Sequence, residues 1–571
     1  MWCLRALLAP HRSGSTADRL NVGRRLKSVK LQSMSAVSTT SRAPANWVQS
    51  INSRVRAENP ALIEWAAAIL SSVLLILSFP NFEFAPLAWV GLVPLLMAIA
   101  RRPSPLSAFF LGWLSGTVFF YGSCYWLTYS MIHYGGLPSI VAYLLLVPGA
   151  IVIGVFPGIF AMALASMIRR VGVAALLLSP IIWVALEYMR LGVTGQLWNA
   201  IGYSQAYYPL LIQAARWGGV YAVGFVILTV NAAVAFVLIR RSVRATLIGF
   251  AALLLAAVLV SASTFAGIGD EQSGAPTYLR VIAIQPNVPM TLVKTNAELQ
   301  YLLERHVSMS DEALRSLPED GVPRLLVWPE SPMNFAYGSD KRFQELVARY
   351  TVEHRTSLLF NSQEPAPGNG TYNSAVLINE QGRMISQYDK IRLLPFGEYV
   401  PIPRWLPGGS LITAIVGDFT PGANYTLMPV AGHRVGVFIC VESAYPSIAR
   451  SFTAGGADFL INISNDGYLG PTAVMRQHLA NAVFRAVENG RQVLRITNSG
   501  ITAKIREDGL IEHETGGFHE AVRNWTINDS LKGNTFYSAH GDLFVQICSI
   551  LSLLMFVGVL VGPKRSSRQP I

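Results

Sequence analysis

The chain has 571 residues, of which 52% are hydrophobic and only 14% are charged. It is too apolar for an ordinary soluble protein of this length, so a membrane protein is the first interpretation. Lys and Arg outnumber Asp and Glu by 45 to 33. Such an excess is compatible with binding to nucleic acid or to anionic lipid, and also with basic cytoplasmic loops. The positions of the basic residues decide between these explanations.

Residues 1–58 are rich in Arg, Ser and Thr, contain few acidic residues and include no apolar span. This composition predicts a basic, disordered N-terminal extension. It is also typical of an organelle transit peptide, and Met34 is a second candidate start.

Eight apolar stretches are long enough to cross a bilayer, whose core of about 30 Å needs roughly 20 helical residues. The fourth is long and contains Pro148 and Pro157. The stretches cover residues 61–80, 85–100, 106–128, 138–168, 172–189, 217–239, 245–266 and 544–562. We therefore expect a seven-helix transmembrane region over 59–268 and an eighth transmembrane helix over 542–563.

Basic residues test this count, because Lys and Arg collect on the cytoplasmic side of membrane helices. With eight spans, every basic cluster falls on one side. The clusters are Arg54 and Arg56; Arg101 and Arg102; Arg169 and Arg170; Arg240, Arg241 and Arg244; and Lys564, Arg565 and Arg568. This topology puts both termini, including the tail at 564–571, in the cytoplasm, and the segment between the last two spans on the outer face. Because topology explains the basic excess, no nucleic-acid partner is predicted.

The four cysteines, at positions 3, 124, 440 and 548, form no C-x-x-C pair and no Cys/His cluster. Neither a metal site nor a disulfide framework is indicated, and no cofactor is predicted. Cys124 and Cys548 lie in apolar spans, where a small buried side chain is the simplest interpretation. Only Cys440 lies in a soluble segment.

Residues 278–538 change pattern to short apolar runs separated by polar or helical stretches, which is typical of an α/β domain whose strands are covered on both faces. Helices are expected near 296–316, 341–353 and 471–490. The candidate strands are YLRVIAIQPNV, RLLVWPES, TSLLFNSQ, NSAVLINE, HRVGVFICVES, DFLINISND and RQVLRITNSG.

Chemically useful residues follow several of these runs, at the positions where open α/β sheets place their sites. Glu330 closes RLLVWPE, Lys390 closes RMISQYDK, and Cys440 follows RVGVFI. Asn465 and Asp466 follow DFLINIS. Each has a simpler alternative when taken alone, such as a solvated loop charge for Lys390 or a core thiol for Cys440. A glutamate, a lysine and a cysteine that all end buried strands nevertheless form a set with a chemical purpose.

That purpose follows from thiol chemistry. A free cysteine has a pKa of about 8.5 and attacks only as the thiolate. Glu330 would take the proton, and Lys390 would stabilise first the thiolate and then the oxyanion of a tetrahedral intermediate. The backbone N–H of Val441 is a second oxyanion donor. Such a set suits acyl transfer through a thioester, and it contains no histidine base.

These residues resemble the nitrilase superfamily, which uses a Glu-Lys-Cys triad on an αββα sandwich. With eight predicted spans and this domain inserted before the last one, the chain is more closely similar to the apolipoprotein N-acyltransferase family. The stretches that carry the resemblance are QPNVP (285–289), VWPES (327–331), YDKIRLLPFGEYVP (388–401), CVESAYP (440–446), NISNDGYLGPT (462–472) and RQHLANAVFRAVENGRQVLRITNSGITA (476–503).

Carried over by position, the resemblance implies that Glu330 is the general base, Lys390 the oxyanion-stabilising lysine and Cys440 the acylated nucleophile. Glu398 would be a second glutamate that supports the triad, and Glu442 a further site carboxylate. One departure lies beside the nucleophile, where the family commonly has tyrosine and this chain has Val441.

The resemblance also implies a reaction and a location. Cys440 would take a fatty acyl chain from a membrane phospholipid and pass it to the α-amino group of a lipoprotein's N-terminal diacylglyceryl-cysteine. The protein would be a multi-pass protein of the bacterial inner membrane with a periplasmic catalytic domain. Two alternatives remain: a membrane-anchored amidase with the same triad, and a transporter or lipid-binding protein with an inactive outer domain.

Substrate contacts are expected in two loops. Asp466 begins one of them, at 466–472, and Asn465 directly precedes it. The other, at 395–412, combines Pro, Gly and aromatic residues, which suggests a membrane-facing segment with Trp405 as its lipid contact.

Overall fold

The computed structural model describes residues 60–101, 104–267, 277–291, 294–395, 397–399, 419–528 and 533–561. The N-terminal extension, most of the loop that carries Trp405 and the C-terminal tail lie outside these residues, so the predictions made for them stay predictions. Residues 58–571 form one compact unit.

Helices occupy all eight stretches predicted to span a membrane. They are α2 (Leu62–Ser78), η1 (Ala85–Trp89) with α3 (Val93–Arg101), α4 (Pro105–Ser123), α6 (Ser139–Val171), η2 (Val173–Leu178) with α7 (Ser179–Thr194), α9 (Ala215–Arg240), α10 (Val243–Gly267) and α17 (Leu543–Val561). Within the described residues, five helices have the length and composition to cross a membrane: Pro105–Ser123, Ser139–Val171, Val173–Thr194, Ala215–Arg240 and Val243–Ala262. The other three apolar helices are shorter, at Leu62–Ser78, Ala85–Arg101 and Leu543–Val559.

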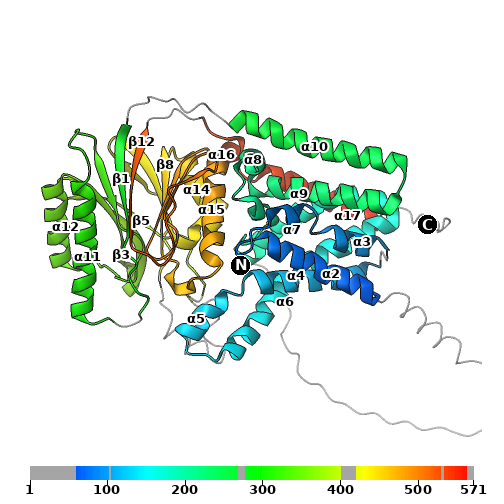
Figure 1. Ribbon diagram of the computed structural model, residues 1–571, viewed down its shortest axis with the longest axis horizontal. Helices are drawn as coiled ribbons and strands as arrows, with labels where there is room; N and C mark the ends of the chain where they lie inside the picture. The colour runs from blue at the N-terminus through cyan, green and yellow to red at the C-terminus, as the bar shows by residue number, and fades with distance from the viewer. Residues whose placement is uncertain are drawn as a thin grey trace, which may run out of the picture. The chain divides into compact units, whose positions relative to one another are not determined.

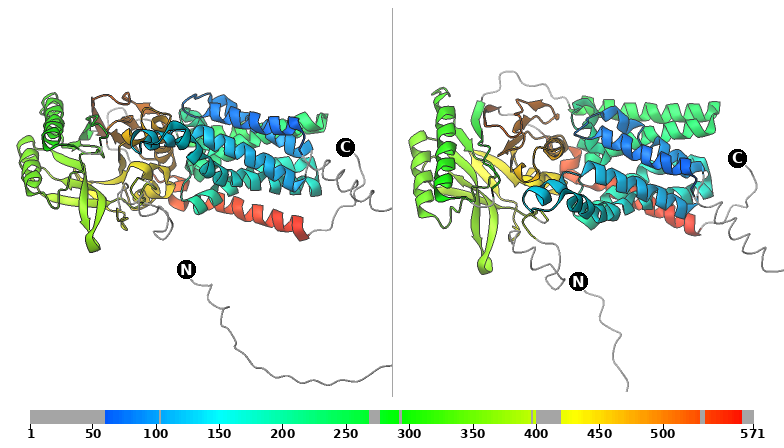
Figure 2. Two further views of the ribbon diagram at one scale, coloured as in Figure 1. Left: turned by 90° about the horizontal axis from the view of Figure 1, so that it is seen from below. Right: turned by 60° about the horizontal axis from the view of Figure 1, so that its bottom comes forward.

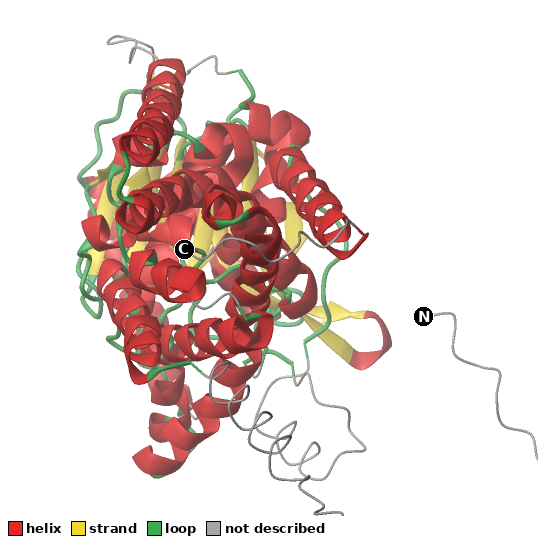
Figure 3. Ribbon diagram, turned by 90° about the vertical axis from the view of Figure 1, so that its right-hand side faces the viewer, coloured by secondary structure: helices red, strands yellow, loops and turns green. Residues whose placement is uncertain are grey.

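Two of these helices differ from the prediction in detail. The third predicted span breaks after Ser123, and a separate short helix, α5 (Leu127–His133), follows. The fourth continues through both prolines and packs against α4. Gly112 of α4 lies so close to the backbone of Pro157 in α6 that a Cβ atom would clash with it. Figure 3 views the helices from their end, with the strands behind them.

Short helices and turns connect the longer elements of the apolar region and of the α/β part. They are η3 (Ile201–Gln205), α8 (Pro209–Ile212), η4 (Pro367–Asn369), η5 (Cys440–Ala444), η6 (Gly467–Leu469) and α16 (Phe536–His540).

Twelve strands in the described residues form two six-stranded sheets. In spatial order, the first contains β12 (Ala521–Asn528), β1 (Thr277–Gln285), β2 (Arg324–Val327), β3 (Ser357–Ala366), β4 (Gly370–Ile378) and β5 (Met384–Asp389). The second contains β11 (Ile511–Glu512), β10 (Ala503–Ile505), β9 (Val493–Thr497), β8 (Phe459–Ser464), β7 (His433–Ile439) and β6 (Leu427–Val430). The central strands of each sheet are parallel, β1 to β3 in the first and β7 to β9 in the second.

Alternate residues of the first sheet belong to two different cores, as a strand with both faces covered requires. Val281 and Val327 share a core with residues of the second sheet, whereas Ile282 and Leu326 pack with the helices α11 (Asn296–Arg315) and α12 (Lys341–His354). The helices α14 (Pro446–Ala454) and α15 (Val474–Asn489) pack on the second sheet (Figure 1).

All seven predicted strands and all three predicted soluble helices are therefore present, with ends shifted by a few residues. The prediction missed α14 and most of the antiparallel edge strands.

Helix α15 lies between the second sheet and the apolar helices, and it contacts both β9 and α9 (Figures 1 and 2). Gln477 makes four hydrogen bonds there. Its Oε1 accepts the indole N–H of Trp126 at 3.0 Å and of Trp198 at 2.8 Å. Its Nε2 donates to the carbonyls of Pro80 and Ser123, both at 2.9 Å. One buried amide thus joins three separate parts of the apolar region to the α/β part.

Replacement of Gln477 by leucine should destabilise the protein strongly. The change leaves two indole N–H groups and two carbonyls without their partner in a buried setting, at a cost of about 1–3 kcal/mol for each unsatisfied group. The measurement is the unfolding temperature of the detergent-solubilised full chain. Gln381→Leu, at an exposed turn, is the matched control and should leave that temperature nearly unchanged. Equal unfolding temperatures for the two variants would contradict the role of Gln477.

Candidate active site

Lys390, the residue after β5, lies between two carboxylates and is 1% exposed. Its Nζ is 2.8 Å from Oε1 of Glu398 and 3.4 Å from Oε1 of Glu330. Glu330 comes three residues after the end of β2, and Glu398 lies in the loop that follows Lys390. The first sheet therefore places one ammonium and two carboxylates together.

Asn373 of β4 holds the two glutamates at a fixed spacing. Its Nδ2 donates to Glu330 at 2.9 Å and to Glu398 at 2.6 Å. Its Oδ1 accepts from Nδ2 of Asn361 on β3 at 2.6 Å. The second oxygen of Glu398 accepts the backbone N–H of Leu394 at 2.7 Å. Because these partners lie on neighbouring strands and a tight loop, the carboxylates are ordered before any substrate binds.

The charge state of Lys390 follows from this arrangement. Burial alone would lower the pKa of its ammonium, but the charges of Glu330 and Glu398 outweigh that effect and hold the pKa above its ordinary value. Lys390 is therefore a permanent cation. Two carboxyl groups thus lie against this one ammonium.

Cys440 follows β7 and begins the 3-10 turn η5. The preceding strand residues Val437, Phe438 and Ile439 are all completely buried, as predicted for a rigid core strand. Cys440 itself has a φ of 51°, in the left-handed region that residues other than glycine rarely adopt. Its carbonyl accepts hydrogen bonds from Nε2 of His478 at 2.9 Å and from Nδ2 of Asn462 at 3.5 Å.

Glu442, two residues further on, ties the cysteine turn to the lysine loop. Its Oε1 accepts the backbone N–H groups of Ile391 at 2.8 Å and Arg392 at 3.0 Å. Its Oε2 accepts the N–H of Ile439 at 2.8 Å, and the hydroxyl of Tyr388 donates to both oxygens. The side chain is completely buried. A single carboxylate therefore fixes the two sheets to each other beside the nucleophile.

The thiol of Cys440 interacts electrostatically with the cluster around Lys390. Burial raises the pKa of the thiol; the negative charge of Glu330 raises it further, and the positive charge of Lys390 lowers it. The net result is a pKa above the ordinary value of a cysteine. At neutral pH the group is a protonated thiol, so its reaction as a nucleophile requires a base that accepts the proton.

The remaining predicted site residues lie near the cysteine turn, apart from Trp405, which is outside the described residues. Val441 is 5% exposed. Oδ1 of Asn465 accepts the backbone N–H of Gly467 at 3.0 Å, which shapes the turn at η6. Asp466 is buried, and its two oxygens bind His478 at 2.7 Å and Arg495 at 2.8 Å. These contacts are internal to the protein, and the prediction that Asn465 and Asp466 bind substrate stays a prediction.

Sequence reasoning missed three polar residues that support the site: Asn373, His478 and Arg495. Asn373 begins the apolar run NSAVLI, and Arg495 interrupts the run VLRIT. A polar residue inside a buried strand was the available signal, because such a group requires a partner. His478 gave no comparable signal, since a helix in an α/β domain often carries polar residues.

Two family models match the chain. Residues 280–530 match the carbon-nitrogen hydrolase model, and residues 71–233 match the model of the apolipoprotein N-acyltransferase N-terminal domain. The α/β part thus defines a protein of the carbon-nitrogen hydrolase class, preceded by apolar helices. A solved structure of an amidase from Nesterenkonia sp. also matches, with 16% identity, a TM-score of 0.35 and coverage of 48% of this chain and 96% of that one.

Among curated relatives, the apolipoprotein N-acyltransferase of Geobacter metallireducens is 35% identical over 85% of this chain and 93% of its own length. The apolipoprotein N-acyltransferase of Pseudomonas syringae pv. tomato is 30% identical over 80% of this chain and 89% of its own. The chain belongs to the apolipoprotein N-acyltransferase family, and it is a membrane protein with the α/β domain of the nitrilase superfamily.

Replacement of Glu442 by glutamine should weaken the site although it changes the shape of the side chain very little. Whichever way the amide is oriented, its NH₂ group faces an N–H or O–H donor, at a cost of about 1–3 kcal/mol in the free energy of unfolding. The measurements are the unfolding temperature and the rate of acyl transfer, and both should fall. Glu380→Gln, at an exposed turn, is the control. An unchanged Glu442→Gln protein would show that this carboxylate does not hold the two sheets together.

Proposed function

We propose that the protein transfers a fatty acyl chain from a membrane phospholipid to the α-amino group of the N-terminal diacylglyceryl-cysteine of apolipoproteins. The fatty acyl chain is held as a thioester on Cys440 between the two half-reactions. The observation that carries the proposal is the cluster of Lys390, Glu330 and Glu398 beside the Cys440 thiol, in a chain of this family.

In the first half-reaction, Glu330 takes the proton of the Cys440 thiol. Because a proton moves from one group to its neighbour, the total charge of the buried site does not change, and burial does not oppose the step. The thiolate attacks the ester carbonyl of the phospholipid. The ammonium of Lys390 and the N–H of Val441 stabilise the oxyanion. The intermediate collapses to the thioester, and the leaving alcohol of the lysophospholipid takes the proton from Glu330.

In the second half-reaction, the free amine of the lipoprotein attacks the thioester. The same two donors stabilise the second oxyanion, and Glu330 accepts a proton from the nitrogen. The Cys440 thiolate then leaves and takes that proton from Glu330, which restores the starting state. Glu398 keeps Lys390 in place in both steps through its 2.8 Å contact. This is a ping-pong exchange, because the lysophospholipid leaves before the amine reacts.

Aminolysis must outpace hydrolysis, and burial favours it. Lys390 is 1% exposed and the side chain of Glu330 is 14% exposed, so little bulk water reaches these groups. The loop that carries Trp405, together with Asn465 and Asp466, would contact the lipid substrates. An amidase would use the same triad, but it would need only one helix as an anchor.

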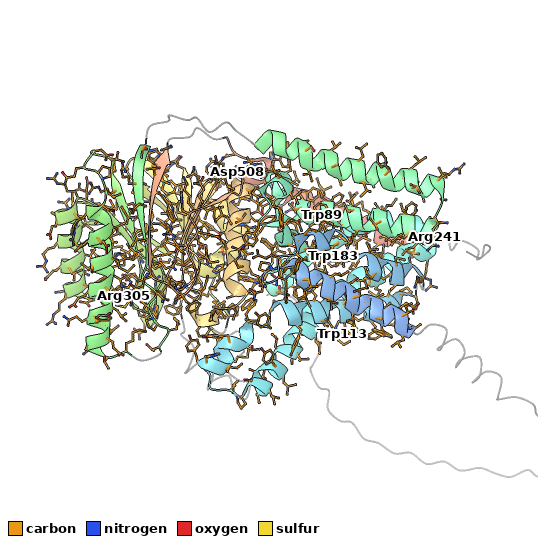
Figure 4. The ribbon with its side chains drawn as sticks, viewed as in Figure 1. Trp89, Trp113, Trp183, Arg241, Arg305 and Asp508 are labelled. Atoms are coloured by element: carbon orange, nitrogen blue, oxygen red, sulfur yellow. The ribbon has the colours of Figure 1, made fainter. Side chains whose placement is uncertain are left out.

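Eight transmembrane helices are proposed for the topology, with both ends in the cytoplasm and the catalytic domain, residues 278–538, in the periplasm. Arg241, at the end of α9 that is remote from the sheets, supports this orientation (Figure 4), since arginines collect on the cytoplasmic side. The proposed boundaries are 1–58 for the extension, 59–268 for seven helices, 542–563 for the eighth helix and 564–571 for the tail. The location would be the inner membrane.

Incubation of the full chain with a phospholipid that carries isotope-labelled acyl chains should give an acyl adduct on Cys440, detected by mass spectrometry of its peptide. Cys440→Ala should give none, and Cys124→Ala should acylate normally. Addition of a diacylated lipopeptide should move the label to the peptide amine. Release of the label as free fatty acid instead would identify a hydrolase, and absence of an adduct in the wild-type chain would exclude the thioester.

Replacement of Glu330 by glutamine should slow acylation by about 10²- to 10⁴-fold, the usual contribution of a general base. The same substitution should make the Cys440 thiol easier to deprotonate. The negative charge of Glu330 raises the pKa of Cys440, so its removal lowers that pKa. The pH at which iodoacetamide alkylates Cys440 at half its maximal rate should therefore be lower than in the wild type. A midpoint that rises would contradict this assignment.

A further inference from the structure

His478 connects the nucleophile turn to a fully buried ionic network. The residue lies on α15 and is 4% exposed. Its Nε2 faces the carbonyl of Cys440 at 2.9 Å, and its Nδ1 faces Oδ1 of Asp466 at 2.7 Å. A carbonyl only accepts hydrogen bonds, so Nε2 carries a proton and donates it to the carbonyl of Cys440. Nδ1 lies between Asp466 and the Nη2 of Arg495, which is 3.1 Å away.

Arg495 of β9 completes the network. Its Nη2 donates to the second oxygen of Asp466 at 2.8 Å, and its Nη1 donates to Oδ1 of Asn462 at 2.6 Å. Burial would raise the pKa of Asp466, but the charges of Arg495 and His478 outweigh it and lower the pKa to about 2. Asp466 therefore stays ionised and holds the imidazole ring in one orientation.

The peptide between Cys440 and Val441 is the group that this network controls. Because a trans peptide is planar, its C=O and its N–H point in opposite directions. A donor that holds the carbonyl of Cys440 on one side consequently fixes the direction of the Val441 N–H on the other. Cys440, whose carbonyl makes this contact, has a left-handed φ of 51°, a strained conformation for a residue other than glycine.

We infer that His478, oriented by Asp466 and Arg495, is a positioning residue that aims the Val441 N–H at the oxyanion of both half-reactions. This inference rests on the proposed function. It also gives the carboxylate of Asp466 a structural task in the active site rather than a contact with substrate.

Two amide variants of similar size test the inference. In His478→Gln the amide nitrogen takes the place of Nε2 and still reaches the Cys440 carbonyl. In His478→Asn the amide nitrogen takes the place of Nδ1 and reaches Asp466 only. Acylation of Cys440 by a phospholipid with labelled acyl chains should stay within a factor of about 10 of the wild type for glutamine. It should fall by about 100-fold for asparagine, with an unchanged KM for the phospholipid.

Alkylation by iodoacetamide reports on the reactivity of the thiol alone, because this displacement forms no oxyanion. It therefore distinguishes an effect on the oxyanion from an effect on the thiol. The rate of alkylation of Cys440 should be about equal in both variants and in the wild type. A fall in alkylation that parallels the fall in acylation would overturn the inference, because His478 would then act on the thiol itself. Equal acylation rates for the glutamine and asparagine variants would also overturn it.

His354→Gln is the matched control. His354 of α12 also faces a carboxylate, Asp311, at 3.4 Å, but it lies on the outer side of the first sheet. Acylation should be unaffected. The wild-type chain is measured in parallel: if it forms no adduct on Cys440, the proposed function fails, whereas a wild-type adduct with no difference between the two amide variants rejects only the role of His478. Unfolding temperatures identify any variant that has lost its fold, and His478→Ala, which also lacks a donor to the Cys440 carbonyl, then replaces it, with the same expected loss as His478→Asn.

Discussion

The burial of one ammonium group governs the geometry of this active site. Lys390 has almost no contact with water, so its charge persists only because two carboxylates lie against it. Two carboxylates in one place repel each other, and the amide of Asn373 together with the lysine keeps them there. Burial, reinforced by the negative charge of Glu330, raises the pKa of the neighbouring Cys440 thiol. In the proposed mechanism, proton transfer to a glutamate is therefore part of the chemistry.

A second constraint comes from the division of the site between two sheets. Lys390, Glu330 and Glu398 belong to the first sheet and its loops, whereas Cys440 belongs to the second. Glu442 crosses between them with hydrogen bonds to backbone N–H groups on both sides. Backbone groups move less than side chains, so this carboxylate fixes the relative position of nucleophile and cation more firmly than a pair of flexible side chains would. In the proposed mechanism, the activity of the site therefore depends on a residue that need not touch the substrate.

Much of the fold was predictable from the sequence, for identifiable reasons. Long apolar stretches and short buried strands have periodicities that are visible in one sequence, and the strand before Cys440 is an example. The edge strands, such as β5, were harder to predict from the sequence, because they include exposed and polar residues. The helix break after Ser123 was also missed, since an apolar stretch shows where a helix can continue but not where packing ends it.

Prediction of the site had a similar limit. Glu330 and Cys440 stand out because each follows an apolar run, and Lys390 because it closes the stretch RMISQYDK. Asn373, His478 and Arg495 do not stand out, because their importance lies in contacts with residues distant in sequence, such as that between Arg495 and Asp466. Strand ends predict which reactive groups converge. They do not predict which groups hold them in place.

The amide of Gln477 has a consequence for how the protein is made. Its partners Pro80, Ser123, Trp126 and Trp198 all precede it in the chain, so they leave the ribosome before the α/β part does. Gln477 can satisfy its hydrogen bonds only when those helices have already been assembled. The adjacent residue, His478, supports the nucleophile. The contacts that hold the turn at Cys440 are thus adjacent in the chain to the contacts that require an assembled membrane region, so the two should form together.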